Sequence, residues 1–89
     1  MEKQVAMNAQ VALVTRAAKL MQAGIEGDIY TCMYPSIDRF TFSFNGICVE
    51  INSADEDWDV KIAQAVAQLD EMILREKAKA EKALAVFYA

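Results

Sequence analysis

The sequence predicts an α+β fold of order α-β-β-β-α, with two helices on one face of a three-stranded antiparallel meander and an over-long C-terminal helix. Three observations predict it. Residues 3–23 carry an apolar stripe at helical spacing. Apolar and polar residues alternate on both sides of an Asn-Gly pair in FTFSFNGICVEI, residues 40–51. From residue 53 no Gly or Pro interrupts the chain, and its 89 residues indicate one domain, 1–89.

The first helix is expected over residues 3–23, because apolar residues recur there at alternating spacings of four and three. The stripe consists of Met7, Val11, Val14, Ala18 and Met21. Leu13, Ala17 and Leu20 widen it. Gly24 is expected to end the helix, because glycine adopts the left-handed conformation at low cost.

Three strands are expected within residues 28–51, at 28–34, 39–44 and 47–51. Residues 35–38, Pro-Ser-Ile-Asp, read as a turn because proline presets its own dihedral and lacks a donor. Asn45-Gly46 predicts a type I′ hairpin, since both residues tolerate positive φ.

The turns also predict the strand register. A two-residue turn makes three apolar pairs across the second and third strands: Phe44 with Ile47, Phe42 with Val49, and Phe40 with Ile51. A four-residue loop pairs Tyr34 with Arg39, Cys32 with Thr41, and Tyr30 with Ser43. The side opposite the phenylalanines, called here the outer face, carries Tyr30, Cys32, Tyr34, Arg39, Thr41, Ser43, Cys48 and Glu50.

The second helix is expected over residues 53–88 and antiparallel to the first. Ser53-Ala54-Asp55-Glu56 fits a capping box, in which Ser53 is the N-cap. A heptad-like stripe follows, consisting of Ile62, Val66, Leu69, Ile73, Ala80, Ala83 and Phe87. At about 1.5 Å per residue the helix is roughly 50 Å long, against about 30 Å for the first helix.

The C-terminal part of the second helix has little of its own chain to cover it, yet it ends in apolar residues. An exposed apolar end of this kind is usually an interface. The sequence therefore predicts a homodimer with an interface formed by Ala80, Ala83, Leu84, Phe87 and Tyr88. The alternative is a bend near residues 76–80 that folds the tail back onto the monomer.

Composition excludes several classes of function. The net charge of −4 argues against direct nucleic-acid binding, which requires a basic face. No stretch approaches the roughly 20 apolar residues of a membrane span, and the N-terminus lacks the order of a signal peptide. We therefore expect the protein to lie in the cytoplasm, which would be that of the host cell if a phage encodes it. Both cysteines are expected to be free thiols there.

No catalytic or cofactor motif is present, so we expect no enzyme, no cofactor and no metal site. The chain has no histidine, the commonest general base. The acids at 55, 57 and 59 resemble the start of a calcium loop, but the required glycine and glutamate are Val60 and Val66. A less favoured hypothesis is an enzyme or redox switch that uses Cys32 or Cys48. Neither cysteine has a basic residue directly across from it to activate the thiol, and unchanged activity after replacement of both by serine would remove this hypothesis.

Two surfaces are candidate partner-binding sites. The acidic cluster contains Asp55, Glu56, Asp57 and Asp59; it serves either the positive end of the helix or a basic partner. Trp58 is then either an aromatic anchor for that partner or, from its spacing to Ile62, part of the core. The outer face contributes Tyr30, Tyr34, Arg39 and Glu50. Tyrosine and arginine are enriched in interfaces, although an antiparallel sheet can also carry an ordinary solvated face.

These features predict a non-enzymatic, acidic protein-binding module that occupies a surface of a larger protein partner. Small acidic α/β proteins without histidine or motifs are frequent among phage and mobile-element products that inhibit host defence systems such as CRISPR. This analogy concerns a class and matches no residue. The alternative is a structural or assembly component, a small chaperone or adaptor, that works through its C-terminal helix.

Overall fold

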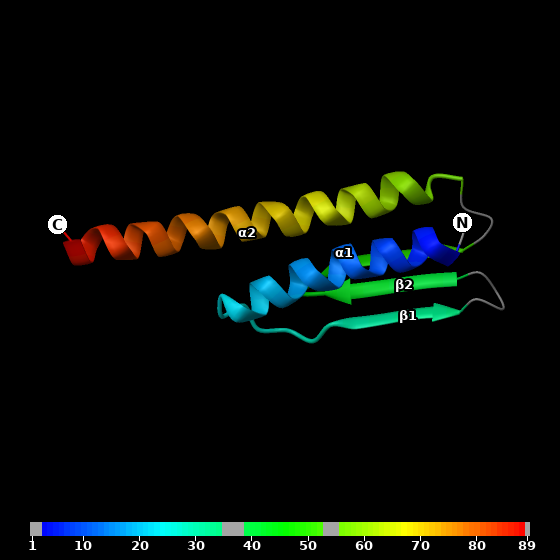
Figure 1. The fold of residues 1–89 in the computed structure, drawn as a ribbon, viewed down its shortest axis with the longest axis horizontal. Helices are drawn as coiled ribbons and strands as arrows, with labels where there is room; N and C mark the ends of the chain where they lie inside the picture. The colour runs from blue at the N-terminus through cyan, green and yellow to red at the C-terminus, as the bar shows by residue number, and fades with distance from the viewer. Residues whose placement is uncertain (1–2, 35–38, 53–55, 89) are drawn as a thin grey trace.

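The α-β-β-β-α order is confirmed by a computed structural model, which describes residues 3–34, 39–52 and 56–88 except the side chains of Lys3, Phe87 and Tyr88. The elements are α1 (Lys3–Gln22), β1 (Tyr30–Tyr34), β2 (Arg39–Phe44), β3 (Ile47–Asn52) and α2 (Trp58–Tyr88). Both helices lie on the same face of the sheet (Figure 1). The expected turn at 35–38 lies outside the described residues.

The sheet has the order β1-β2-β3 with antiparallel neighbours, and all six predicted residue pairs are present. The hairpin turn explains the register between β2 and β3. Asn45 has φ 49° and Gly46 has φ 84°, so both central residues adopt the positive φ that a type I′ turn requires. A side chain at Gly46 would be strained in this conformation.

The core lies between the sheet and the two helices. Phe40, Phe42 and Phe44 of β2 are at most 1% exposed, and they pack against Leu13, Ala17 and Leu20 of α1 and Ala65 and Leu69 of α2. Trp58 is partly buried against the same cluster, which favours the core over an aromatic anchor for this residue. The central strand therefore supplies the largest share of buried aromatic surface, the main favourable term in folding.

The buried stripe of α1 is rotated from the predicted one. Met7, Val11 and Met21 are exposed, at 41%, 64% and 44%. The buried residues are Leu13, Ala17 and Leu20, which the prediction placed at the side of the stripe, together with Ala6 and Ala9. Alanines let the helix axis approach the sheet and α2 closely, whereas a central row of Met and Val would hold the helix away from the flat aromatic layer.

Gly24 ends α1 as predicted. The Ile25 N–H donates to the Leu20 carbonyl and the Gly24 N–H donates to the Met21 carbonyl, both at 3.0 Å, while Gly24 has φ 97°. These two bonds form a Schellman motif, which satisfies carbonyls that the last helical turn leaves unpaired.

The expected antiparallel orientation of the helices is wrong: α1 and α2 run in the same direction (Figure 1). Three strands separate them, and an odd number of antiparallel strands reverses the chain so that the second helix repeats the direction of the first. The Arg16 side chain accordingly bonds Asp70 at 2.8 Å, while Leu20 and Ile73 share a hollow one turn further along both helices.

The start of α2 differs from the predicted capping box. The helix begins at Trp58, and Glu56 and Asp57 lie in the turn before it. The Lys61 N–H donates to the Asp57 carbonyl at 3.1 Å, so Asp57 occupies the N-cap position. Aspartate is as good an N-cap as serine, so Asp57 can cap the helix four residues after the predicted position. Residues 53–55, with the predicted N-cap Ser53, lie outside the described residues.

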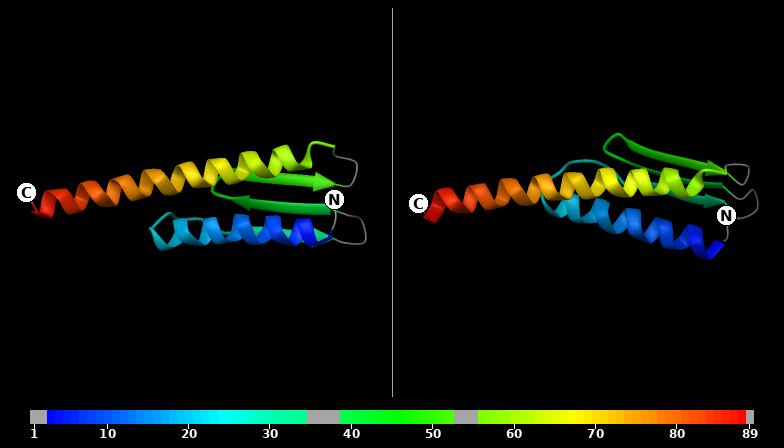
Figure 2. Two further views of the ribbon diagram at one scale, coloured as in Figure 1. Left: turned by 45° about the horizontal axis from the view of Figure 1, so that its top comes forward. Right: turned by 90° about the horizontal axis from the view of Figure 1, so that it is seen from above.

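The tail of α2 extends beyond the rest of the molecule as one continuous helix (Figure 2). The 31-residue helix carries the molecule to a length of 56 Å, and the described side chains of residues 77–86 are all exposed. The alternative in which the tail bends near residues 76–80 and folds back is therefore wrong. Neither α1 nor the described part of α2 contains a window apolar enough to cross a membrane.

Candidate functional site

The outer face is not covered by any described part of the chain, because both helices occupy the opposite face of the sheet (Figure 2). Tyr30 and Tyr34 are 55% and 43% exposed. Tyrosines on the same side of an edge strand thus present aromatic surface to solvent, together with the polar side chains of β2 and β3.

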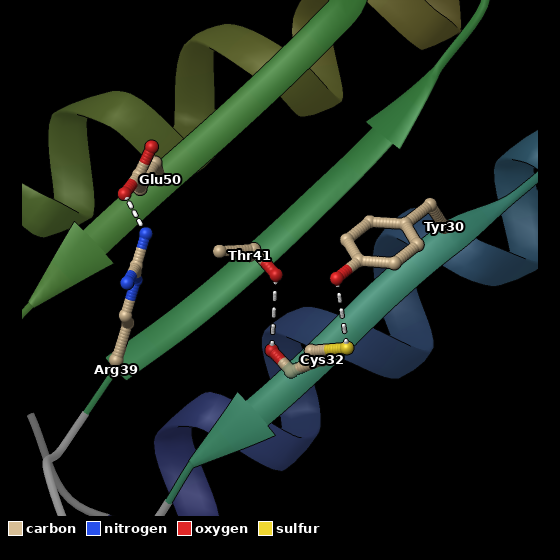
Figure 3. Close-up of polar contacts among 5 residues, drawn as sticks. All are labelled: Tyr30, Cys32, Arg39, Thr41 and Glu50. Atoms are coloured by element: carbon tan, nitrogen blue, oxygen red, sulfur yellow. Dashed lines mark hydrogen bonds and ion pairs between the residues drawn. The ribbon is translucent and has the colours of Figure 1, made fainter.

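Arg39 and Glu50 form an ion pair across β2 and β3 on the outer face (Figure 3). Their side chains are 42% and 63% exposed, so the pair contributes little to stability. Its consequence is geometric: it holds the guanidinium along the sheet surface and joins the two charges into one polar element.

The thiol of Cys32 lies among hydroxyl groups. Its Sγ is 3.3 Å from the Tyr30 hydroxyl, and the Thr41 hydroxyl donates to the Cys32 carbonyl at 3.5 Å (Figure 3). Hydrogen bonding from Tyr30, and then from Tyr34, to the thiolate lowers the pKa of Cys32. The hydrogen bond with Cys32, and then the negative charge of its thiolate, raise the pKa of Tyr30 to about 12.

This arrangement predicts the pH dependence of thiol alkylation. In a Cys48→Ser background only Cys32 remains, and its midpoint for reaction with iodoacetamide should lie below that of an ordinary thiol. Tyr30→Phe removes the hydroxyl and should raise the midpoint, since the thiolate loses its main stabilising bond. Ser43→Ala, a hydroxyl deletion on the same face that leaves Tyr30 intact, is the control. An equal midpoint in the Tyr30→Phe and parent proteins would contradict the assignment.

A shallow hollow of about 310 Å³ crosses the middle of the outer face. Its lining includes Tyr30 on β1, Thr41 on β2 and Glu50 on β3, of which Tyr30 and Glu50 are exposed. The hollow is open, and its lining includes Phe42 and Val49 beside polar side chains. In the described residues no group of three or more Cys, Asp or Glu side chains is placed to hold a metal ion.

The acidic cluster forms a second surface, separate from the outer face. Glu56, Asp57 and Asp59 are exposed where the chain enters α2, on the helical side of the sheet. This is the end of the molecule at which β1 and β3 finish, so the acids and Tyr34 share one end (Figure 1). Asp59 accepts a 2.9 Å bond from the Val60 N–H, as expected for an acid in a first helical turn. Asp55 lies outside the described residues.

The predicted dimer residues of α2 divide into two groups. Ala80, Ala83 and Leu84 are exposed, Leu84 at 55%. The helix continues through Phe87 and Tyr88, but their side chains lie outside the described part of the structure. Val86, at 79% exposed, is a further apolar residue of the tail beside the predicted interface residues.

Two features of the site were missed from the sequence. The first is the contact between the Cys32 thiol and the Tyr30 hydroxyl. The spacing Tyr30-Cys32-Tyr34 could have indicated it, because alternate residues of a strand share one face and can contact each other. The other is an apolar hollow at the end of α1, lined by Lys19, Leu20, Ala23, Ile73, Glu76, Lys77 and Ala80. It depends on how two helices of unequal length align, which no local pattern shows.

Comparison with family models, curated proteins and solved structures found no match to this chain.

Proposed function

We propose that the protein is a non-enzymatic module that binds a larger protein partner in the cytoplasm and acts by occupying a surface of that partner. The observation that carries the proposal is the uncovered outer face, where exposed Tyr30 and Tyr34 stand beside the paired charges of Arg39 and Glu50. Tyrosine and arginine are the residue types that most often dominate the energy of protein interfaces.

The outer face suits binding because part of it is already ordered. The Tyr30 hydroxyl is tied to Cys32, and Arg39 is tied to Glu50. Side chains held before binding lose less rotamer freedom when a partner arrives, which lowers the entropic cost of association. The twisted three-stranded surface also offers a contact area continuous across the strands, with the hollow at its centre.

The acidic cluster supports a basic partner. The net charge is −4, and Glu56, Asp57 and Asp59 are exposed at one end. Such a field speeds encounter with a positively charged surface and disfavours acidic ones. We extend the proposal to an inhibitor from a phage or mobile element that covers a basic, nucleic-acid-binding surface of a host defence protein. The class-level analogy supports this extension.

Charge reversal tests the acidic cluster. The partner is first captured from the native host with tagged protein, identified by mass spectrometry and purified. Asp57→Lys/Asp59→Lys should then weaken its binding by tenfold or more, mainly through a slower association rate, at about 1.4 kcal/mol per tenfold. Glu26→Lys/Asp28→Lys gives the same change of charge on exposed residues elsewhere and should have a smaller effect. Unchanged binding by the first variant, with its fold intact by circular dichroism, would remove the acids from the site.

The exposed tail of α2 favours a second candidate, a structural or assembly component. In that case Leu84 and Val86 belong to the working surface and the acids are incidental. Truncation after Lys82 separates the two functions. Loss of self-association and of partner binding together favours assembly through the tail. Loss of self-association alone favours the outer face or the acids as the partner site.

A further inference from the structure

We propose that two copies of the chain pair through residues 77–88 of α2 in an antiparallel arrangement, with Ala80 of one copy opposite Ala83 of the other. This inference rests on the homodimer that the sequence predicts and specifies its geometry. It is carried by the direction in which the free helical surface faces, by the hollow beside it, and by the charges along it.

The free surface of the tail continues the surface that α2 buries within the monomer. Leu69 is fully buried, Ile73 and Glu76 are partly buried, and Ala80 and Ala83 follow at spacings of four and three but are exposed. At 3.6 residues per turn these positions lie on one side of the helix. The tail therefore continues the apolar stripe that α2 buries in the core. The stripe is exposed there because α1 ends before it reaches this part of α2.

Small residues at the centre of this stripe are flanked by larger apolar ones. Leu84 and Val86 lie on its two sides and are 55% and 79% exposed. Ala80 and Ala83 allow a second helix to come close, and Leu84 and Val86 can then close over it. The apolar hollow at the end of α1, about 320 Å³, lies at the inner end of the same stripe. It lies where the last turn of α2 from the second copy would pack.

The position of the folded body excludes a parallel pair on this surface. Up to residue 76 the same side of α2 is covered by α1 and the sheet. A second α2 running in the same direction would have to pass through them. An antiparallel copy arrives from the free end instead, and its own body lies beyond the tip of the first tail.

The charges favour the same arrangement. In a parallel pair, the partly buried Glu76, which accepts a 3.1 Å bond from Lys79 of its own chain, would face Glu76 of the other copy. Reversing one helix aligns Ala80 with Ala83 and places Lys77 beside Leu84 of the other copy. Lys79 then lies beside Val86, so that lysine stems cover apolar side chains while their ammonium groups reach water. The stripe is thus self-complementary about a twofold axis, as an isologous interface requires.

The contact is small. Two paired segments of this length, with the hollow, bury on the order of 1,000 Å² in total, at the low end for specific interfaces. We therefore expect a dimer that dissociates at micromolar concentrations, and whose two bodies lie at opposite ends of an extended particle.

Small-angle X-ray scattering with sizing chromatography across micromolar concentrations tests the arrangement without any other protein. The antiparallel dimer should be about 90 Å long, because two 56 Å molecules overlap only along their tails. Ala83→Glu should raise the dissociation constant at least tenfold, because it places a charge in the seam. Ala78→Glu is the matched control: the same substitution on an exposed alanine of α2, on the far side of the helix, should leave the dimer unchanged.

Three results would overturn the inference. They are a monomer at every concentration, a compact dimer no longer than one molecule, and equal weakening by Ala83→Glu and Ala78→Glu. None of them bears on partner capture through the outer face or the acids, which is measured with the charge-reversal variants. A failed tail dimer and a failed binding module are therefore distinguishable.

Discussion

Replacing Phe42 with alanine is expected to lower the free energy of unfolding by about 3–5 kcal/mol. Phe42 is 1% exposed and sits at the centre of β2, where both helices meet the sheet. The substitution loses the transfer free energy of the ring and leaves a cavity that the rigid sheet cannot close. Domains of this size are stable by only about 5–15 kcal/mol, so the variant should be close to unfolding.

Urea denaturation followed by far-ultraviolet circular dichroism measures this loss. Ser43→Ala is the matched control, because it is the next residue of β2 but lies on the outer face, and it should change stability by less than about 0.5 kcal/mol. A loss below about 1 kcal/mol for Phe42→Ala would contradict the placement of the core between β2 and the helices.

Removing the two exposed tyrosines should have the largest effect on partner binding. With the captured partner, Tyr30→Ala/Tyr34→Ala is expected to weaken affinity by roughly 30- to 1,000-fold, equivalent to about 2–4 kcal/mol. The variant loses the exposed aromatic area of both side chains. It also loses the hydrogen bond with Cys32 that orients Tyr30. Isothermal titration calorimetry with the purified partner measures the change.

The control for that variant removes exposed apolar area of similar kind elsewhere. Val11 and Leu74 are 64% and 66% exposed on α1 and α2, and Val11→Ala/Leu74→Ala should bind as the parent does. Thermal unfolding of both double variants separates a binding defect from a folding defect. If the tyrosine variant binds normally, the outer face is an ordinary solvated face and the partner site lies elsewhere.

The candidate site was partly predictable from sequence. Period-two alternation and the Asn45-Gly46 turn place Tyr30, Arg39 and Glu50 on one face, and the structure has them there. The bond between Tyr30 and Cys32 was not predicted, because it depends on side-chain rotamers and not on register. The start of α2 was also missed, because several acids compete as N-cap and the path of the chain after β3 decides between them.

The meander, its register and the length of α2 follow from local sequence signals alone. A two-residue turn aligns its strands in one way only, and the absence of Gly and Pro lets a helix continue. Tertiary structure alone decided which side of α1 is buried. Met7, Val11, Leu13 and Ala17 give that helix apolar residues around much of its circumference, so hydrophobicity does not choose a side. Close packing against the phenylalanines of β2 does choose, and it selects the alanine and leucine rows.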